Sequence, residues 1–118
     1  MKFSSLLYGL AVAMRHSARK YPAFRARLAE KNLVAQIKLM DGSRGRSFAF
    51  QDGRLRSRRG IHPAPDVTIA FKSAKLAAKL LTPPIDYQRQ IDAQKNFALT
   101  LDGPEELALW FTETILMV

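Results

Sequence analysis

The chain has 118 residues, which is enough for one domain with a real hydrophobic core. It is 47% apolar and has no cysteine, which excludes disulfides and thiolate metal sites and fits a reducing compartment such as the cytoplasm. The net charge of +9 is uneven, since residues 1–63 hold 14 Lys and Arg against 3 Asp and Glu, whereas residues 64–118 hold 5 against 7. The basic first half favours an anionic partner such as a phospholipid surface, nucleic acid or an acidic protein.

The first predicted element is an amphipathic helix over residues 3–20, in which apolar residues from Phe3 to Met14 recur at spacings of three and four. Pro22 suits the first turn of a second helix, so we expect residues 1–30 to form a helical N-terminal segment. This segment either packs on the domain or a neighbouring chain, or lies on an anionic membrane. In the second interpretation its basic side chains contact lipid phosphates, and these are Arg15, Arg19, Lys20, Arg25 and Arg27.

The apolar run that follows Lys2 also resembles a signal peptide, with Ala11-Val12-Ala13 in the place of a cleavage site. The run is short, is interrupted by Ser4, Ser5 and Gly9, and continues as a helical pattern beyond that place. We therefore favour a helix of the folded protein. No stretch of the sequence approaches the roughly 18 apolar residues that a membrane-spanning helix needs.

Four predicted strands follow, and we expect them to pair in succession as an antiparallel sheet. Alternating apolar residues predict strands over 33–40 and 47–51. Asp52-Gly53 is a strong hairpin signal, and residues 54–59 continue as the returning strand. A loop stiffened by two prolines then leads to the fourth strand, over 66–71.

Arg54, Arg56 and Arg58 lie on one side of the third predicted strand, where they form a charged strip suited to phosphates. No aromatic residues alternate with these arginines and no nucleic-acid motif is present, so a stacking platform for bases is missing. The main interpretation is a solvated edge strand whose charges block unwanted pairing. An anionic membrane or a partner protein comes second, and nucleic acid is the least favoured partner.

The second half of the sequence adds two helices, a strand and a last helix, over residues 73–81, 85–94, 96–102 and from Pro104 onwards. Ser73 is a suitable N-cap for the first of these helices. The helix over 85–94 is the most polar of them, with Tyr87 and Ile91 expected to point inward. Glu105 and Glu106 complement the dipole of the last helix from its first turn.

The sequence shows no recognisable catalytic or metal-binding motif. His16 and His62 have no cysteine or carboxylate cluster at ligand spacing, and a zinc site needs three protein ligands, so we expect no metal and no cofactor. His62 and Asp66 flank a stiff loop with no nucleophile nearby, and the serines lack the G-x-S-x-G motif. Glu105 and Glu106 are adjacent on a helix and point apart. We therefore predict that this chain alone is not an enzyme.

The order of the elements carries a resemblance to a known family over residues 28–118. The stretches that carry it are Asp66-Val-Thr-Ile-Ala-Phe71, Ser73-Ala-Lys-Leu-Ala-Ala-Lys-Leu-Leu81 and Asn96-Phe-Ala-Leu-Thr-Leu-Asp-Gly103. They resemble the second half of the sterol carrier protein type 2 domain, and Phe48-Ala-Phe-Gln-Asp-Gly-Arg54 resembles its central hairpin. The family's usual glycine-lysine pair before the late strand appears here as Ala93-Gln-Lys95. The resemblance implies an α+β fold with a five-stranded, mainly antiparallel sheet covered by helices, to which the N-terminal amphipathic helix is added.

The resemblance also implies a function for residues 28–118. In that family an apolar tunnel between the sheet and the helices accepts fatty acyl chains, sterols or other lipids. It implies that this chain binds a fatty acyl, sterol or isoprenoid-like lipid non-covalently, as a carrier or as a module that presents a substrate to a fused or partner enzyme. The implied ligand contacts come from the helix at 73–81, the strand at 96–102 and the last helix, and are Leu76, Leu80, Phe97, Leu99, Leu101, Trp110, Phe111 and Ile115.

The alternative is a non-catalytic interaction or structural domain whose core is filled by its own side chains. Its basic N-terminal helix and its apolar end at Leu116-Met117-Val118 then dock onto a partner protein or a second copy of the chain. The spacing of the apolar residues does not separate the two hypotheses, because residues that face a ligand and residues that face a core repeat with the same period.

Overall fold

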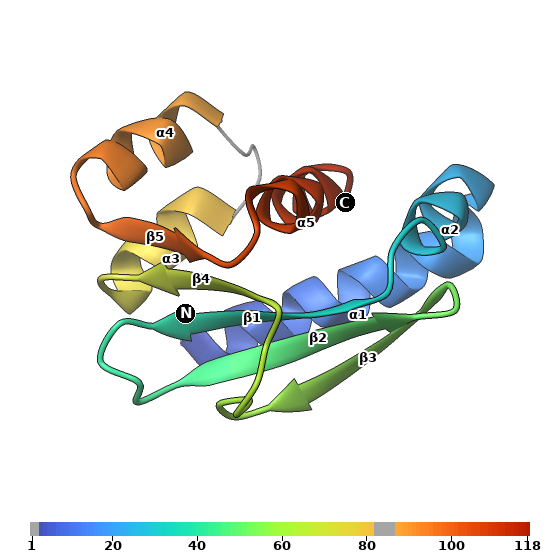
Figure 1. Cartoon of the computed structure of the whole chain (residues 1–118), viewed down its shortest axis with the longest axis horizontal. Coiled ribbons are helices and arrows are strands. Elements are labelled where there is room, and N and C mark those ends of the chain that lie inside the picture. The colour runs from blue at the N-terminus through green and yellow to red at the C-terminus, as the bar shows by residue number, and fades with distance from the viewer. Residues whose placement is uncertain (1–2, 82–86) are drawn as a thin grey trace.

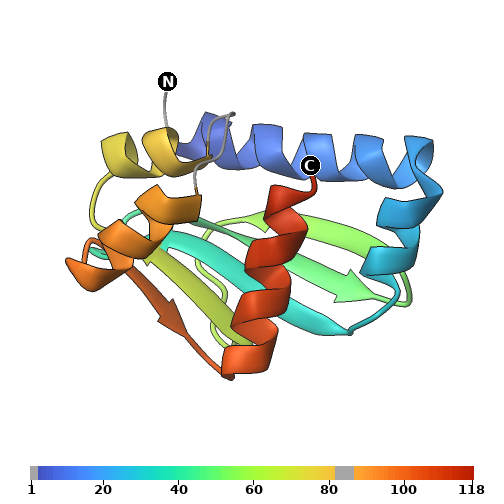
Figure 2. The same cartoon turned by 90° about the horizontal axis from the view of Figure 1, so that it is seen from above.

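The computed structural model describes residues 3–81 and 87–118, which form a five-stranded sheet with helices on one side of it (Figure 1, Figure 2). The α+β architecture predicted from the sequence is confirmed. The helices are α1 (Phe3–Lys20), α2 (Pro22–Leu28), α3 (Ala74–Leu81), α4 (Tyr87–Lys95) and α5 (Glu105–Leu116). The strands are β1 (Leu33–Leu39), β2 (Gly45–Gln51), β3 (Arg54–Arg59), β4 (Val67–Phe71) and β5 (Leu99–Asp102).

The sheet has the strand order β3-β2-β1-β4-β5. The pairs β1–β2, β2–β3 and β4–β5 are antiparallel, whereas β1 and β4 run parallel. The sheet is therefore mainly antiparallel, as predicted, but the expectation that the fourth strand pairs antiparallel with the third is wrong. A parallel pair requires the chain to cross the sheet between its strands. Residues 60–66 make this crossing over β2 and β1 (Figure 1).

Hydrogen bonds hold the crossing loop against β1. The carboxylate of Asp66 accepts the backbone N–H of Val34 at 2.8 Å, and the N–H of Asp66 donates to the Val34 carbonyl at 2.8 Å. The N–H of His62 donates to Oε1 of Gln36 at 2.6 Å, and His62 Nδ1 accepts the N–H of Ala64 at 3.0 Å. His62 and Asp66 therefore help to hold the crossing loop in place.

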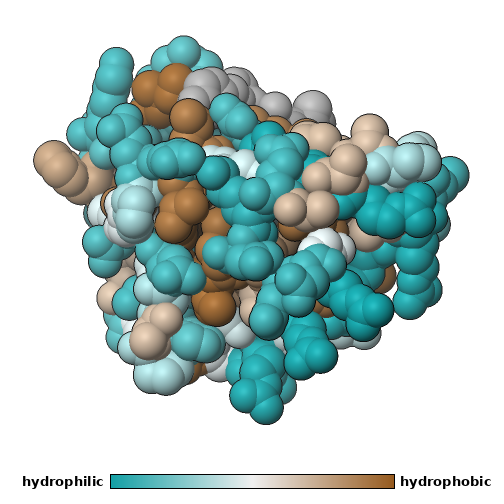
Figure 3. Space-filling view, turned by 45° about the vertical axis from the view of Figure 1, so that its right-hand side comes forward, coloured by the Kyte–Doolittle hydropathy of each residue, from teal (hydrophilic) through white to brown (hydrophobic). Residues whose placement is uncertain are grey.

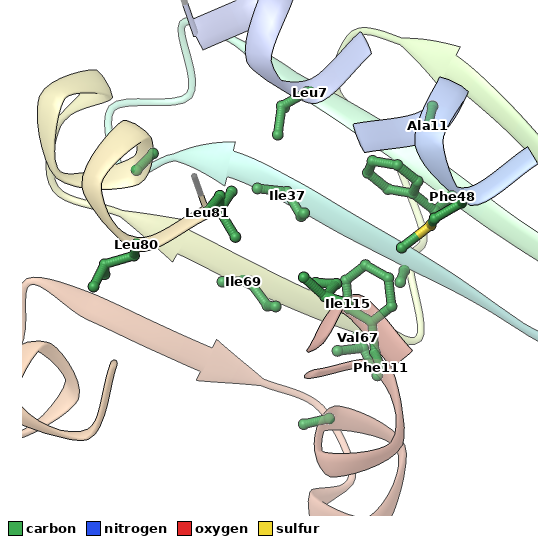
Figure 4. Close-up of a cluster of buried hydrophobic side chains, with 14 of the residues drawn as sticks. Leu7, Ala11, Ile37, Phe48, Val67, Ile69, Leu80, Leu81, Phe111 and Ile115 are labelled. Atoms are coloured by element: carbon green, nitrogen blue, oxygen red, sulfur yellow. The ribbon is translucent and has the colours of Figure 1, made fainter. Parts of the chain in front are cut away.

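The core lies between the sheet and the helices, because alternation along the strands points apolar side chains to one face. Ile37 of β1, Phe48 of β2 and Ile69 of β4 belong to this core, and Leu7 and Ala11 of α1 pack onto it (Figure 4). The apolar stripe of the N-terminal helix is thus buried in the domain. Of the two interpretations of that helix, the structure has the one in which it packs intramolecularly.

Arg27 of α2 forms hydrogen bonds and an ion pair with α5. Its Nη2 donates to the Trp110 carbonyl at 3.0 Å, and its Nε donates to the Thr114 hydroxyl at 3.1 Å. The guanidinium lies 5.1 Å from the Trp110 ring centroid and forms an ion pair with Glu113 at 3.2 Å. The Arg27 side chain is only 17% exposed. The sequence analysis placed Arg27 among the side chains expected to contact lipid phosphates. In the structure its guanidinium group instead binds residues of α5.

The connection between α4 and β5 explains why this strand starts at Leu99 and not at residue 96. The N–H of Ala98 donates to the Ala93 carbonyl at 2.9 Å and the N–H of Phe97 donates to the Gln94 carbonyl at 3.1 Å. These are the two hydrogen bonds of a Schellman C-cap, whose C′ position is usually a glycine in the left-handed region. Phe97 occupies that position with φ of 58° and is 80% exposed. It lies outside the strand on which the sequence placed it.

We expect Phe97→Gly to raise the free energy of unfolding by up to about 1 kcal/mol, because glycine adopts positive φ without a Cβ clash. Urea denaturation followed by circular dichroism measures this change. Phe97→Ala is the control, since alanine keeps the Cβ and should leave stability nearly unchanged. A loss of stability in the glycine variant would show that the phenyl ring contributes contacts that outweigh the strain.

The remaining elements match their predictions closely. The polar helix predicted over 85–94 is α4, and α3 and α5 begin within one residue of their expected starts. Thr82-Pro83-Pro84 predicts the end of α3, because a proline disfavours the helical region for the residue before it, but these residues lie outside the described ones. The same holds for the first two residues of the predicted polar helix and for the side chain of Tyr87.

Candidate ligand-binding site

A pocket of about 360 Å³ lies between the β4–β5 edge of the sheet and helices α3, α4 and α5. This volume falls in the range of roughly 300–1,000 Å³ that small-molecule sites occupy. Its apolar lining residues are Ile69, Phe71, Leu81, Ile91, Leu99, Leu101, Ala108, Leu109 and Ile115. The remaining lining residues are Gln90, Gln94, Gly103, Glu105 and Thr112.

The strand register builds the floor of this pocket. Ile69 pairs with Leu101 and Phe71 pairs with Leu99 in the antiparallel β4–β5 ladder. Side chains of paired residues point to the same face of a sheet. The four apolar side chains therefore form one continuous surface beneath α4 and α5.

One face of α5 forms a wall of the pocket. Its lining residues begin at Glu105 and continue through Ala108 and Thr112 to Ile115, which is the spacing of one helical stripe. In Figure 4, Ile115 of α5 and Leu81 of α3 approach Ile69 of β4 from two sides. The Thr112 hydroxyl donates to the Ala108 carbonyl at 2.9 Å, so its polar group is satisfied within the helix.

No family model and no curated protein matches the sequence. Solved structures do match it. A structure named UbiJ-SCP2 ubiquinone synthesis protein is 18% identical, with a TM-score of 0.66 over 99% of this chain and 94% of that one. Palmitated SCP2L2 from Aedes aegypti is 21% identical, with a TM-score of 0.63 over 98% of this chain and 95% of that one.

The fold is that of the sterol carrier protein 2 domain. The resemblance inferred from the order of elements is confirmed at this level. The sterol carrier protein 2 fold also matches part of a longer chain, the sec-alkylsulfatase Pisa1 from Pseudomonas sp.. That match has 18% identity and a TM-score of 0.54, and covers 77% of this chain but 13% of the sulfatase.

Within this sterol carrier protein 2 fold, the residues expected to contact a ligand fall into two groups. Leu99, Leu101 and Ile115 line the pocket. Leu76 and Leu80 of α3 pack against the general core, with Leu80 buried, and Phe97 is in solvent. The last two expected residues, Trp110 and Phe111, do not line the pocket either.

Trp110 and Phe111 lie on the side of α5 that faces β2. The Trp110 ring contacts Phe50 edge-on with centroids 5.2 Å apart, and the Phe111 ring lies 5.8 Å from that of Phe48. Both residues are buried, but neither is among the lining residues of the pocket. The structure places them in the core that joins α5 to the sheet.

Several lining residues were not among those expected to contact a ligand, and these are Ile69, Phe71, Leu81, Ile91, Ala108 and Leu109. For β4 a signal was present, because Ile69 and Phe71 alternate on the same face as the core. For α5 the sequence pattern was ambiguous, because apolar residues such as Leu109 and Trp110 occur on more than one side of the helix. The sequence does not say which side meets the sheet.

An ion pair between Lys31 and Glu106 lies at the start of α5. Lys31 Nζ lies 2.8 Å from Glu106 Oε1, and this hydrogen bond and its charge lower the pKa of the Glu106 carboxyl. The contact ties the start of α5 to the residues before β1. Within residues 3–81 and 87–118, no three His, Cys, Asp or Glu side chains are grouped so as to hold a metal ion.

The other basic residues expected at a membrane lie along α1 and α2. Arg19, Lys20 and Arg25 are exposed, and Arg15 is half-buried. Arg54, Arg56 and Arg58 are exposed on the helix-free face of β3. Hydrophilic side chains gather at the lower middle and lower right of the molecule in Figure 3. None of the helices in the described residues combines the length and apolarity needed to cross a bilayer.

Proposed function

We propose that this chain binds an apolar ligand non-covalently in the pocket between β4, β5 and helices α3 to α5. In this proposal it acts as a lipid carrier or as a module that presents a lipid-like substrate, and performs no chemistry itself. The observation that carries the proposal is the apolar floor of Ile69, Phe71, Leu99 and Leu101 under an open volume of about 360 Å³.

The driving force is removal of ligand surface from water. Each methylene group that enters an apolar site contributes about 0.8 kcal/mol, so a segment of eight contributes about 6 kcal/mol before the entropic cost of association. This hydrophobic contribution to binding requires no charged residue in the pocket. The apolar walls therefore support binding of an aliphatic or isoprenoid chain.

The lining of the pocket also offers polar groups to one end of a ligand. Gln90 and Gln94 of α4 bring amide groups to the lining, and amides both donate and accept hydrogen bonds. The exposed carboxylate of Glu105 also lines the pocket and repels an anionic end group. We therefore expect the carboxylate of a bound fatty acid to lie beside the two amides and away from Glu105.

The names of the structural neighbours agree with this proposal. One is palmitated and one is a ubiquinone synthesis protein, which makes fatty acyl and isoprenoid-like chains the first ligands to test. The sulfatase match supports the version in which the domain serves a larger enzyme. The alternative of a filled core is not favoured, because the floor and the α5 wall leave a pocket open between them.

Leu109→Gln tests the pocket directly, with Met117→Gln as its control. Leu109 lines the pocket and is 47% exposed, whereas Met117 at the C-cap of α5 is 49% exposed and does not line it. Losing the leucine contact with a ligand should weaken binding about tenfold, which corresponds to roughly 1.4 kcal/mol. Titration with a fluorescent fatty acid measures both variants.

The control variant should bind within about twofold of the wild type, since a 0.4 kcal/mol change is near the scatter of surface substitutions. Equal affinities for Leu109→Gln and the wild type would contradict the placement of the ligand in this pocket. Circular dichroism and thermal unfolding confirm that both variants remain folded.

A further inference from the structure

A second pocket, of about 590 Å³, lies between the first turns of α1 and the strand ends around the β1–β2 turn. It shares no lining residue with the apolar pocket. Its lining includes Ser4 and Tyr8 of α1, Ser43 and Arg44 of the turn, Arg46 of β2 and Arg59 of β3. Three arginines therefore line one pocket.

Arg46 and Arg59 are directly opposite each other in the antiparallel β2–β3 pair. Like charges in this position destabilise a sheet, because their Cβ atoms are about 5 Å apart. Arg15 adds further positive charge, and burial together with Arg15 and Arg59 lowers the pKa of Arg46. An anion bound between these groups removes the repulsion.

Arg46 is held in a fixed position within this pocket. Its Nε donates to the Ser57 hydroxyl at 2.6 Å, and its guanidinium lies 5.3 Å from the Tyr8 ring centroid. These contacts use one N–H group and one face of the planar group. The terminal amino groups of a guanidinium stay suited to paired hydrogen bonds with an oxyanion.

Within residues 3–81 and 87–118, no carboxylate forms an ion pair with the arginines of this pocket. In the described part of the chain, ion pairs involve Arg27 and Lys31, and none involves Arg44, Arg46 or Arg59. The nearest acid in sequence, Asp41, accepts hydrogen bonds from the Ser43 N–H at 2.9 Å and hydroxyl at 2.6 Å, which lower the pKa of its carboxyl. Arg27, with two glutamate partners, shows how the same chain neutralises an arginine elsewhere.

We propose that this pocket binds a phosphate group, carried by a phospholipid head group or by a soluble phosphate ester. Arginine is the side chain best suited to phosphate, because its planar fork matches two phosphate oxygens. The hydroxyl of Ser4, which also lines the pocket, adds a neutral donor. The site is independent of the apolar pocket, so its failure leaves the proposed lipid site untouched.

The test compares two double variants of equal charge. Arg44→Ala/Arg59→Ala removes two arginines from the pocket, whereas Arg54→Ala/Arg56→Ala removes two exposed arginines on the opposite face of β3. Each variant takes the net charge from +9 to +7 by losing two positive side chains. NMR titration with inorganic phosphate follows the Arg46 Nε–H signal in each protein.

We expect saturable shifts of the Arg46 signal in the wild type, with affinity at least tenfold weaker in the pocket variant and within twofold in the control. Equal weakening in both variants would show a non-specific charge effect, and absence of a saturable shift in the wild type would show that no phosphate site exists. Either result overturns the proposal.

Vesicles of phosphatidylcholine with and without phosphatidylglycerol distinguish the two phosphate sources. If the site takes a lipid head group, the wild type and the control variant sediment with the anionic vesicles and the pocket variant does not. If it takes a soluble ester, vesicle binding is equal in the pocket and control variants while phosphate still shifts the Arg46 signal of the wild type.

Discussion

Replacing Phe111 by alanine should lower the free energy of unfolding by about 3–5 kcal/mol, the usual cost of deleting a buried phenyl group. Phe111 is fully buried, and its ring lies 5.8 Å from that of Phe48 and 5.9 Å from that of Phe50. These contacts join α5 to β2, so the cavity left by alanine weakens the attachment of the whole helix. Guanidinium denaturation followed by tryptophan fluorescence measures the loss.

Phe97→Ala is the matched control for this substitution, because Phe97 is 80% exposed. It should change stability by less than about 0.5 kcal/mol, as surface substitutions usually do. The affinity for a fatty acid shows whether Phe111 is a core residue or contacts the ligand. If it is a core residue, Phe111→Ala should keep near-normal affinity under conditions in which the variant is folded. If Phe111→Ala had normal stability and altered affinity, Phe111 would be a ligand contact, as the sequence analysis predicted.

Gly103→Ala should destabilise the protein by about 2–6 kcal/mol, since left-handed strain and overpacking contribute roughly 1–3 kcal/mol each. Gly103 joins β5 to α5 with φ of 117°. A Cβ added here would overlap the carbonyl oxygen of Asp66 and lie 3.2 Å from the Cα of Val67. Both obstacles are backbone atoms, which cannot move without shifting the start of β4.

Gly42→Ala isolates the conformational part of this effect. Gly42 also has a positive φ, of 75°, but a Cβ there meets nothing within 4 Å. Its substitution should therefore cost about 1–2 kcal/mol, from the left-handed backbone alone. Thermal and urea unfolding of both variants gives the comparison. Equal losses would mean that the close approach of Gly103 to Asp66 does not contribute.

Most elements could be predicted from local patterns. Alternation identified the strands, and proline and capping residues marked the helix starts, because both signals depend on neighbouring residues. The parallel pairing of β1 and β4 could not be found in this way. It depends on the crossing of residues 60–66 and on contacts such as that of Asp66 with Val34, which join distant parts of the chain.

The site was harder to predict than the fold. Leu99, Leu101 and Ile115, predicted from the sequence as ligand contacts, line the pocket, and their contact with a ligand stays a prediction. The division of α5 between pocket and core was missed, since apolar residues occur on both sides of that helix. Phe97 was misplaced because the left-handed C-cap geometry of a phenylalanine carries no sequence signal.

The central claim is that the pocket beside β4 and β5 takes an apolar ligand. Native mass spectrometry of the purified protein, followed by organic extraction and lipid identification, tests it most directly. The account predicts a lipid or isoprenoid-like species at near-stoichiometric amount, or its uptake when fatty acids are added to the empty protein. A protein that carries no such species and ignores added fatty acids would contradict the account and favour an interaction domain.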